Sequence, residues 1–333
     1  MRSMLARACA MSCLLALAAC VGSPEVVGTA GERPGARDRS VVPLDPSAGG
    51  PARGSLASDG SGETGSAPRP ATRPYEGLGT WIDIYDTEVW EHPVHAVRSM
   101  SAHGIRTIYL QSSNYNRNRP FVHPDGVEAI VDAAHRQGIE VVAWYLPGFR
   151  DLPLDLHRAV RTIRFETGRG NRFDSFALDI ESPEVRRASL RTTRLLRMSA
   201  AIRRAAGAEY PLGAIVASPD RLVRTDPHFW PGFPWRRLAD TYDVFLPMTY
   251  YTYRVQGPRA AAWYTAQNVS IIRQETSGMQ VPIHVVGGIS FDATGPETQG
   301  FVQTVLERDV IGASYYTFPG ITLDQWKALS ALR

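Results

Sequence analysis

Cysteine and lysine are scarce in this chain. Its three cysteines, Cys9, Cys13 and Cys20, all lie within the first 20 residues, and Lys327 is the only lysine among 333 residues. A folded part that begins beyond Cys20 therefore has no disulfide and no thiol for ligating a metal or attacking a substrate. The formal net charge of +3 is small for this length, so the composition gives no reason to expect a nucleic-acid partner.

Two kinds of site motif are also absent. No β-rich run is followed by a glycine-rich phosphate loop, and neither a Gly-x-Ser-x-Gly elbow nor a Ser-His-Asp order is present. A nucleotide-binding fold and a serine hydrolase therefore have little support.

The N-terminus has the pattern of a secretory signal. Two arginines precede an apolar stretch, residues 9–19, which is too short for a comfortable membrane span. Residues 17–20 read Leu-Ala-Ala-Cys and resemble a bacterial lipobox. The resemblance implies cleavage after a signal peptide of residues 1–19 and lipidation of Cys20. We expect a lipoprotein on the extracytoplasmic face of the cell membrane, held there only by this anchor; an ordinary signal peptide with a chance cysteine is the alternative.

The next segment has the composition of a flexible linker. Residues 21–74 are rich in Gly, Pro, Ser, Ala and Arg and show little apolar periodicity. Such a segment cannot bury enough apolar surface to offset the entropy lost on ordering. We therefore expect residues 20–74 to be the lipidated cysteine and a disordered tether, and residues 75–333 to be the folded domain.

From Gly77 onward, short β-rich runs alternate eight times with amphipathic helical runs. The strands are expected at 78–85, 105–112, 139–146, 175–181, 211–218, 243–250, 281–289 and 311–318. This alternation implies right-handed βαβ units and a parallel sheet, and eight units match a TIM barrel. The predicted fold class is α/β, a single (β/α)8 TIM barrel preceded by a signal peptide and a tether; a doubly wound open sheet is the alternative.

The fourth expected strand carries two acidic residues on one face. Side chains alternate along a strand, so Ala177, Asp179 and Glu181 share a face and the opposite face is apolar. If the apolar face packs against helices, Asp179 and Glu181 point into the barrel at its C-terminal end. Barrel enzymes place their chemistry at that end.

The same sorting assigns further side chains to the barrel mouth. These expected ligand-contacting residues are Asp83, Tyr85, Gln111, Tyr145, Ser218, Met248, Tyr250 and Tyr315. For Asp83, pairing with an arginine is the alternative. Acidic, amide and aromatic groups meet there without a lysine, which suits a neutral polyhydroxylated ligand and would make a poor phosphate site. Trp144 falls on the outward face of its strand, and His284 lies low in the barrel as a core histidine.

The acidic pair suggests a reaction. Two carboxylates on one strand face lie roughly 7 Å apart, and their repulsion raises the pKa of the more buried one. Cleavage of a glycosidic bond needs a carboxylic acid that stays protonated near neutral pH. We assign Glu181, nearer the mouth, as the general acid and Asp179 as its electrostatic and hydrogen-bonding partner. A structural pair bonded to the backbone is the alternative.

This strand resembles the strand-four signature of the family-18 glycoside hydrolases, the chitinase-like barrels. Their pattern is Asp-Gly-x-Asp-x-Asp-x-Glu, and Asp174, Asp179 and Glu181 match its first Asp, last Asp and Glu. Ser175 replaces the Gly and Ala177 replaces the middle Asp.

Strand six resembles the same family's Met-x-Tyr-Asp segment. Met248 and Tyr250 match it, and Tyr251 stands where Asp is usual. The resemblance implies that Glu181 protonates the leaving oxygen, while Asp179 and Tyr250 position a substrate 2-acetamido group as internal nucleophile. The Asp-x-Glu pair together with Asp83 also resembles family-25 lysozyme-like barrels. That resemblance would make Asp179 or Asp83 the partner of Glu181.

These patterns favour a cell-surface, monomeric hydrolase of a polysaccharide or oligosaccharide, including N-acetylhexosamine polymers, without cofactor or metal. Ala177 and Tyr251 favour a second hypothesis, a glycan-binding barrel without catalysis. A structural envelope lipoprotein with a protein partner is the third.

Some conspicuous side chains have simpler interpretations. His92 and His95 lack an identifiable third metal ligand. The aromatic loop 220–235 suits a small core of its own, with Trp230 the side chain most suited to contact a sugar. The arginines of the helical run 183–206 suit a solvated face.

Overall fold

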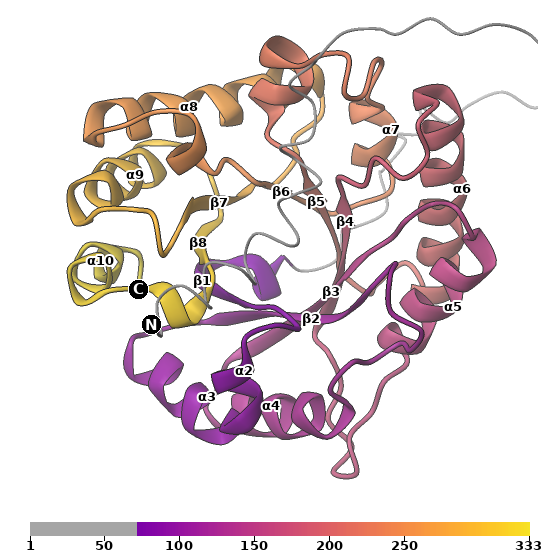
Figure 1. Cartoon of the computed structure of the whole chain (residues 1–333), viewed down its shortest axis with the longest axis horizontal. Coiled ribbons are helices and arrows are strands. Elements are labelled where there is room, and N and C mark those ends of the chain that lie inside the picture. Colours follow the sequence, from indigo (N-terminus) through magenta and orange to yellow (C-terminus); the bar gives the residue numbers. More distant parts are fainter. Residues whose placement is uncertain (1–71) are drawn as a thin grey trace, which may run out of the picture. The chain divides into compact units, whose positions relative to one another are not determined.

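The computed structural model describes residues 72–333, which Figure 1 shows as a ring of strands surrounded by helices. The expected signal peptide, Cys20 and the linker up to residue 71 lie outside the described residues, so those expectations stay predictions. The described chain begins with a short 3-10 turn, η1 (Arg73–Tyr75).

Eight strands form one sheet. They are β1 (Gly77–Ile82), β2 (Thr107–Asn114), β3 (Glu140–Leu146), β4 (Ser175–Ile180), β5 (Leu212–Val216), β6 (Val244–Pro247), β7 (His284–Ile289) and β8 (Gly312–Tyr316). Neighbours run parallel in the order β6-β5-β4-β3-β2-β1-β8-β7. Bridges from Phe245 to Ile283 and from Met248 to Val286 link β6 to β7. The sheet is a nearly closed barrel, which confirms the predicted (β/α)8 class.

Helices connect successive strands around the barrel (Figure 1). The α-helices are α2 (Thr87–Glu91), α3 (Pro93–Ala102), α4 (Pro124–Arg136), α5 (Leu152–Ile163), α6 (Ala188–Ala206), α7 (Trp235–Ala239), α8 (Pro258–Glu275), α9 (Gly295–Glu307) and α10 (Leu323–Leu329). Short turns of other helix types are η2 (Arg221–Thr225), η3 (Tyr251–Tyr253), η4 (Phe318–Gly320) and η5 (Ser330–Leu332).

The helix starts follow local sequence rules. Pro93, Pro124 and Pro258 begin α3, α4 and α8, at the position where the missing N–H of proline costs nothing. Thr294 and Glu297 form a capping box at the start of α9. None of the helices within residues 72–333 combines the length and the apolar character needed to cross a membrane.

Two apolar layers pack on the two faces of the barrel sheet. Phe176, Leu178 and Ile180 of β4 belong to the outer layer, between the sheet and the helices. Ala177 belongs to a smaller inner layer that fills the barrel together with Trp81. The pleat of β4 therefore has the predicted polarity, and it turns Asp179 to the inside of the barrel.

Candidate active site

The acidic pair lies at the carboxyl end of β4. Asp179 is in the strand and only 4 % exposed, whereas Glu181 is the first residue beyond it and is partly exposed. No donor within the described residues reaches the buried Oδ1 of Asp179. The structure therefore places a buried acceptor without a partner beside a more accessible carboxyl group, at the mouth of the barrel.

Burial changes the acidity of both groups. It raises the pKa of Glu181 to about 7, although the positive charge of Arg221 opposes the rise. It also raises the pKa of Asp179, and the negative charge of Glu181 raises it further. Because the two carboxyl groups interact, they titrate as a pair. Near neutral pH the pair can hold a proton and release it to a bound molecule.

A second acidic group, Asp83, follows β1. Its Oδ2 accepts a hydrogen bond from the Tyr316 hydroxyl at 2.8 Å, and its Oδ1 accepts one from the Tyr85 backbone N–H at 2.6 Å. The nearby Asp86 accepts from the Asp83 backbone N–H at 2.9 Å. Burial raises the pKa of both carboxyl groups. Since both Asp83 oxygens have partners, Asp83 holds the end of β8 in place.

Aromatic rings form the floor beneath these carboxylates. Trp81 stacks on Tyr109 with ring centroids 4.4 Å apart, and Trp144 meets Trp81 edge-on at 5.7 Å. The Trp81 indole donates to Ser314 Oγ at 2.8 Å. Met248 packs in the same inner layer, as its predicted position requires. The floor excludes water from below, which accounts for the strong effect of burial on the acidic pair.

Two tyrosines line the side of the site formed by β6 and β8. Tyr250 has a left-handed backbone (φ 34°), and its ring lies 6.0 Å from that of Tyr316. Tyr316 in turn lies 6.2 Å from Trp81. The sequence does not single out Tyr316, because the alternation of side chains predicts its neighbour Tyr315 on the inner face.

The prediction that Tyr315 of β8 faces the inside of the barrel is wrong. Tyr315 packs on Phe301 of α9 at 5.2 Å and is hydrogen bonded to Tyr251, so it lies in the outer layer. The adjacent Ser314 and Tyr316 face the inside. Aromatic residues occupy successive positions of this strand, so its sequence carries no polarity that marks the inner face.

The same error occurs in β3, which is apolar on both faces, as is typical of a buried parallel strand. Tyr145 points outward, where its hydroxyl donates to Asp155 Oδ1 at 2.6 Å and accepts from Arg158 Nη1 at 2.9 Å. Trp144, expected outside, lies inside. Tyr145 is therefore a residue of the helical layer.

Three other predicted contacts have different surroundings. Ser218 Oγ is hydrogen bonded to Tyr264 and Asn268 of α8, both at 2.8 Å, so it faces the helices. Gln111 is fully buried, and its Oε1 accepts from the Ile84 backbone N–H at 3.0 Å, which fixes the loop after β1. Tyr85 is partly exposed at that loop, with a guanidinium 5.3 Å above its ring.

Two buried arginines lie on the β4–β5 side of the site. The Arg221 guanidinium is 3.9 Å from the centre of the Phe229 ring, and that of Arg191 is 4.0 Å from the Trp230 ring. Arg191 also donates to the carbonyl of Ser182, the residue after Glu181. The helix containing Arg191 therefore does not present a wholly solvated arginine face. The sequence could have indicated these residues only through the aromatic loop on which they stack.

That aromatic loop is a small core, as predicted, but Trp230 is no surface contact. Its side chain is fully buried, and its Nε1 donates to Thr192 Oγ1 at 2.9 Å. Phe233 lies edge-on to it at 5.2 Å.

Asp174, which matches the first Asp of the family-18 pattern, has a structural role. Asp174 precedes β4, and its Oδ2 accepts hydrogen bonds from the Val141 backbone N–H at 2.7 Å and from His135 Nε2 at 2.9 Å. His284 is fully buried in the barrel, with its Nδ1 bonded to the Tyr75 carbonyl at 2.7 Å. Both residues stabilise the fold at positions away from the β4 carboxylates.

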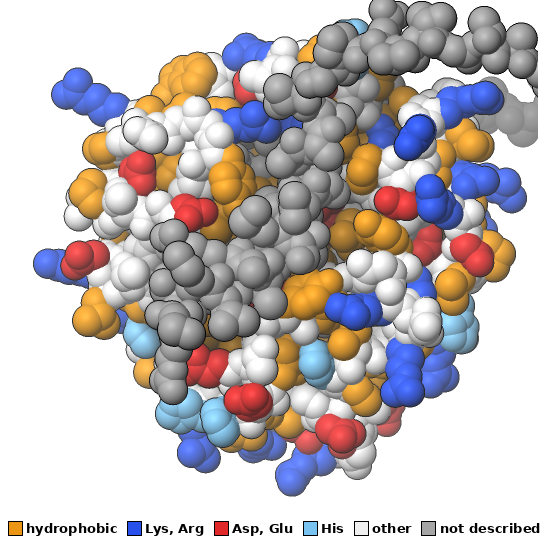
Figure 2. All heavy atoms as spheres, in the orientation of Figure 1, with side chains coloured by type: hydrophobic (Ala, Val, Ile, Leu, Met, Phe, Trp, Pro, Cys, Tyr) orange, Lys and Arg blue, Asp and Glu red, His pale blue; other side chains and the backbone are white. Residues whose placement is uncertain are grey.

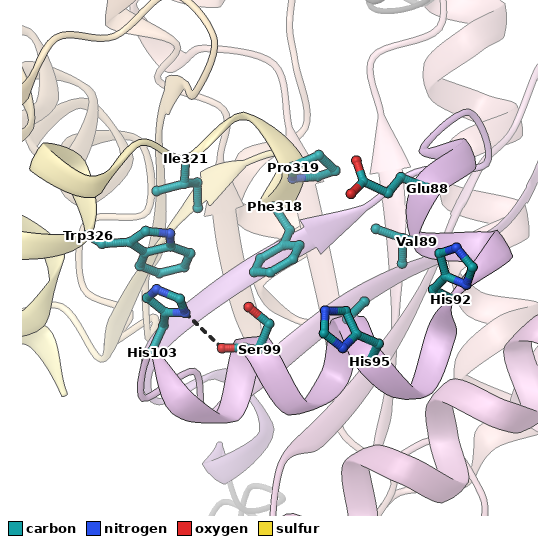
Figure 3. A pocket seen from close by; sticks show the side chains of 11 residues that line it. Glu88, Val89, His92, His95, Ser99, His103, Phe318, Pro319, Ile321 and Trp326 are labelled. Carbon is teal, nitrogen blue, oxygen red and sulfur yellow. Dashed lines mark hydrogen bonds between the residues drawn. The ribbon is translucent and has the colours of Figure 1, made fainter.

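His95 of α3 and the flanking His92 and His103 line a separate cavity of about 260 Å³ between α3 and the C-terminal segment. Figure 3 shows His95 on α3 and His103 directly after the last residue of this helix, with Phe318 above them. His103 stacks on Trp326 at 4.3 Å, and its Nδ1 is hydrogen bonded to the Ser99 carbonyl at 2.8 Å. Within the described residues no group of three His, Cys, Asp or Glu side chains is arranged to hold a metal.

The face of the molecule seen in Figure 2 carries mixed charge. Lys and Arg side chains are interspersed with Asp, Glu and apolar side chains among the described atoms. The site is therefore best defined by its buried carboxylates and rings, and the surface charge adds little to its definition.

Comparison with known proteins identifies relatives in structure only. No family model matches the sequence, and no curated protein matches it. A plant class V chitinase mutant from Cycas revoluta in complex with (GlcNAc)3 has a TM-score of 0.57 at 13% identity, over 77% of this chain and 99% of that chain.

Two further structures are similar. The GH5_18 protein of Bifidobacterium longum has a TM-score of 0.57 at 12% identity and covers 78% of each chain. The β-mannanase of the blue mussel Mytilus edulis has a TM-score of 0.52 at 10% identity, over 77% of this chain and 91% of that chain. The described part of this protein is thus a TIM barrel of the architecture found in glycoside hydrolases.

Proposed function

We propose that this protein hydrolyses glycosidic bonds of a polysaccharide, with Glu181 as the general acid. The observation that carries the proposal is a carboxyl group with a pKa raised to about 7, partly exposed at the mouth of a barrel and next to a second buried carboxylate. Such a group can protonate a leaving oxygen near neutral pH. The aromatic floor offers apolar faces on which a sugar ring can stack.

Asp179 serves as the partner of Glu181 in this proposal. Its unpartnered Oδ1 can accept a hydrogen bond from a bound molecule, such as an amide N–H of an N-acetyl group. Tyr250 follows β6, which is separated from β4 by β5 alone, and is the second residue that we assign to positioning. N-acetylhexosamine polymers are therefore the first substrates to test, and the (GlcNAc)3 bound by the similar chitinase supports this choice.

We also propose that lipid on Cys20 holds the enzyme at the cell surface. The lipobox-like residues 17–20 support this location. The barrel would then act on glycans outside the cytoplasm, at a distance from the membrane set by the intervening linker.

The test is Glu181→Gln, which keeps the shape of the side chain and removes the proton donor. The kcat/KM for hydrolysis of N-acetylglucosamine and mannose polymers, measured from the reducing ends released, should fall by about 10²–10⁴-fold. Asp132→Asn is the control, because Asp132 lies on α4 and bonds Thr167 and Asn171 away from the mouth. A Glu181→Gln enzyme with full activity would show that another group donates the proton.

A second candidate, a glycan-binding barrel without catalysis, is favoured by one observation. Tyr251 stands where the resemblance expects an Asp, and its side chain is fully buried in the outer layer. It therefore cannot replace that carboxylate at the mouth. Glycan binding without turnover, kept in Glu181→Gln, would select this candidate.

A further inference from the structure

A line of aromatic rings leads from the barrel floor to its exposed rim. Ring centroids lie 6.2 Å apart between Trp81 and Tyr316, and 6.0 Å apart between Tyr316 and Tyr250. The line continues from Tyr250 to Tyr253 at 6.3 Å. Exposure rises along it from 2 % at Trp81 to 46 % at Tyr253. Stacking surface for a ligand therefore extends beyond the tyrosine assigned to the reaction.

Tyr253 is held by the short helix η3, which is packed firmly on β7. Tyr251 of this helix is fully buried, and Thr252 Oγ1 accepts a hydrogen bond from the Ile289 backbone N–H at 3.3 Å. The Tyr253 backbone N–H donates to the Tyr250 carbonyl at 3.1 Å. The exposed ring is thus part of a fixed platform, and a ligand that stacks on it need not order a loose loop.

Two residues of the loop after β7 lie at the same edge. Asp292 is close enough to Tyr253 for its charge to add to the effect of burial, and together they raise the pKa of the Tyr253 hydroxyl to about 12. Phe291, the residue before Asp292, is 51 % exposed. A Cβ atom at Gly320 would lie 2.7 Å from the Phe291 ring, so this ring packs against η4. The loop after β7 therefore supplies a carboxylate near Tyr253 and, one residue earlier, an exposed ring packed against η4.

We propose that Tyr253 and Asp292, with Phe291 next to Asp292 in the chain, form a second glycan subsite, the rim site, which binds a sugar unit beyond the one that Tyr250 positions. The inference rests on the proposed function and deepens it. Rings can stack on the C–H face of a sugar, and a carboxylate can accept hydrogen bonds from its hydroxyl groups. The substrate class is then a long neutral glycan chain that spans from Glu181 to Tyr253, and removal of single terminal sugars would not use the rim site.

Binding measurements separate the rim site from catalysis. The protein is the Glu181→Gln chain, and the probes are the disaccharide and hexasaccharide of N-acetylglucosamine and of mannose, titrated by calorimetry. We expect the hexasaccharide of at least one series to bind more tightly than its disaccharide. Tyr253→Ala should weaken hexasaccharide binding about three- to tenfold, and Tyr253→Phe should retain most of it.

The matched control is Trp263→Ala, because Trp263 is an equally exposed ring (52 %) on α8. Its loss should leave the affinity for hexasaccharide unchanged. If Tyr253→Ala binds hexasaccharide as tightly as its parent, or if chain length has no effect, the rim site is overturned while glycan binding at the carboxylates stands. If neither sugar series binds the parent at all, the proposed function fails, and the rim site fails with it.

Discussion

The Tyr316 hydroxyl donates a hydrogen bond to Asp83 Oδ2 at 2.8 Å, which ties the last residue of β8 to the loop after β1. Since β1 and β8 are the first and last strands, the bond joins the two ends of the barrel. It also sets the orientation of the ring that links Trp81 to Tyr250. Asp83, which the sequence offers as a candidate catalytic partner, thus holds the Tyr316 ring in position.

Removal of that hydroxyl should affect function more than a similar change one residue away. Tyr316→Phe leaves a buried Asp83 oxygen without its donor, which should cost about 1–3 kcal/mol of stability and lower kcat/KM. Tyr315→Phe, which removes a hydroxyl bonded in the outer layer, should cost a similar stability without lowering kcat/KM. Urea unfolding and hydrolysis rates measure the two effects. Equal losses of activity in both variants would count against the assignment of Tyr316 to the site.

The pH dependence of hydrolysis should reveal the effect of the Arg221 charge on Glu181. Activity should fall as the pH rises through about 7, because only protonated Glu181 donates and its pKa is raised to about 7. Arg221→Gln removes a charge that opposes this rise, so the alkaline limb of kcat/KM should move upward by roughly one pH unit.

Arg224→Gln is the control for that experiment. Arg224 lies in the same η2 segment, but its guanidinium donates to Gln267 of α8 at 2.8 Å. Its loss should leave the alkaline limb in place. A limb that stays fixed or moves downward in Arg221→Gln would contradict the electrostatic role of Arg221.

Stability should depend on pH through Glu181 itself. Its folded pKa of about 7 lies above the usual value of 4.5, so between these values the folded chain retains a proton that the unfolded chain has lost. The contribution of this proton to the free energy of unfolding is complete below pH 4.5 and is lost as the pH rises through 7. Glu181→Gln should therefore be more stable than the parent above pH 7, by roughly 1–3 kcal/mol, and the gain should vanish below pH 4.5. Denaturant titrations at both pH values test this, and a gain independent of pH would point to packing instead.

Membrane attachment should depend on one cysteine. Cys20→Ala should abolish labelling by radioactive palmitate in the expressing bacterium and release the protein from the membrane fraction, because the lipid is expected on that sulfur. Cys13→Ala, within the apolar part of the signal, should leave labelling intact. Labelling that survives in Cys20→Ala would refute the lipobox assignment.

The sequence alone was sufficient for the architecture and for the central pair. Eight alternations of β-rich and helical runs determine the barrel, because each period reflects local backbone geometry. In β4 the polar and apolar residues alternate without ambiguity, so the sequence by itself places Asp179 and Glu181 at the mouth. Met248 and the buried His284 could be placed in the same way.

Only the tertiary structure decided which neighbours surround that pair. In β3 and β8 both faces are apolar or aromatic, so the alternation could not show that Trp144 and Tyr316 face inward while Tyr145 and Tyr315 face the helices. Loops after the strands follow no period, and for this reason Arg221 and the exposed ring of Tyr253 became apparent only from their packing. The sequence determines the alternation of side chains along each strand. Which of the two faces points into the barrel depends on how the side chains of the other strands and of the helices pack.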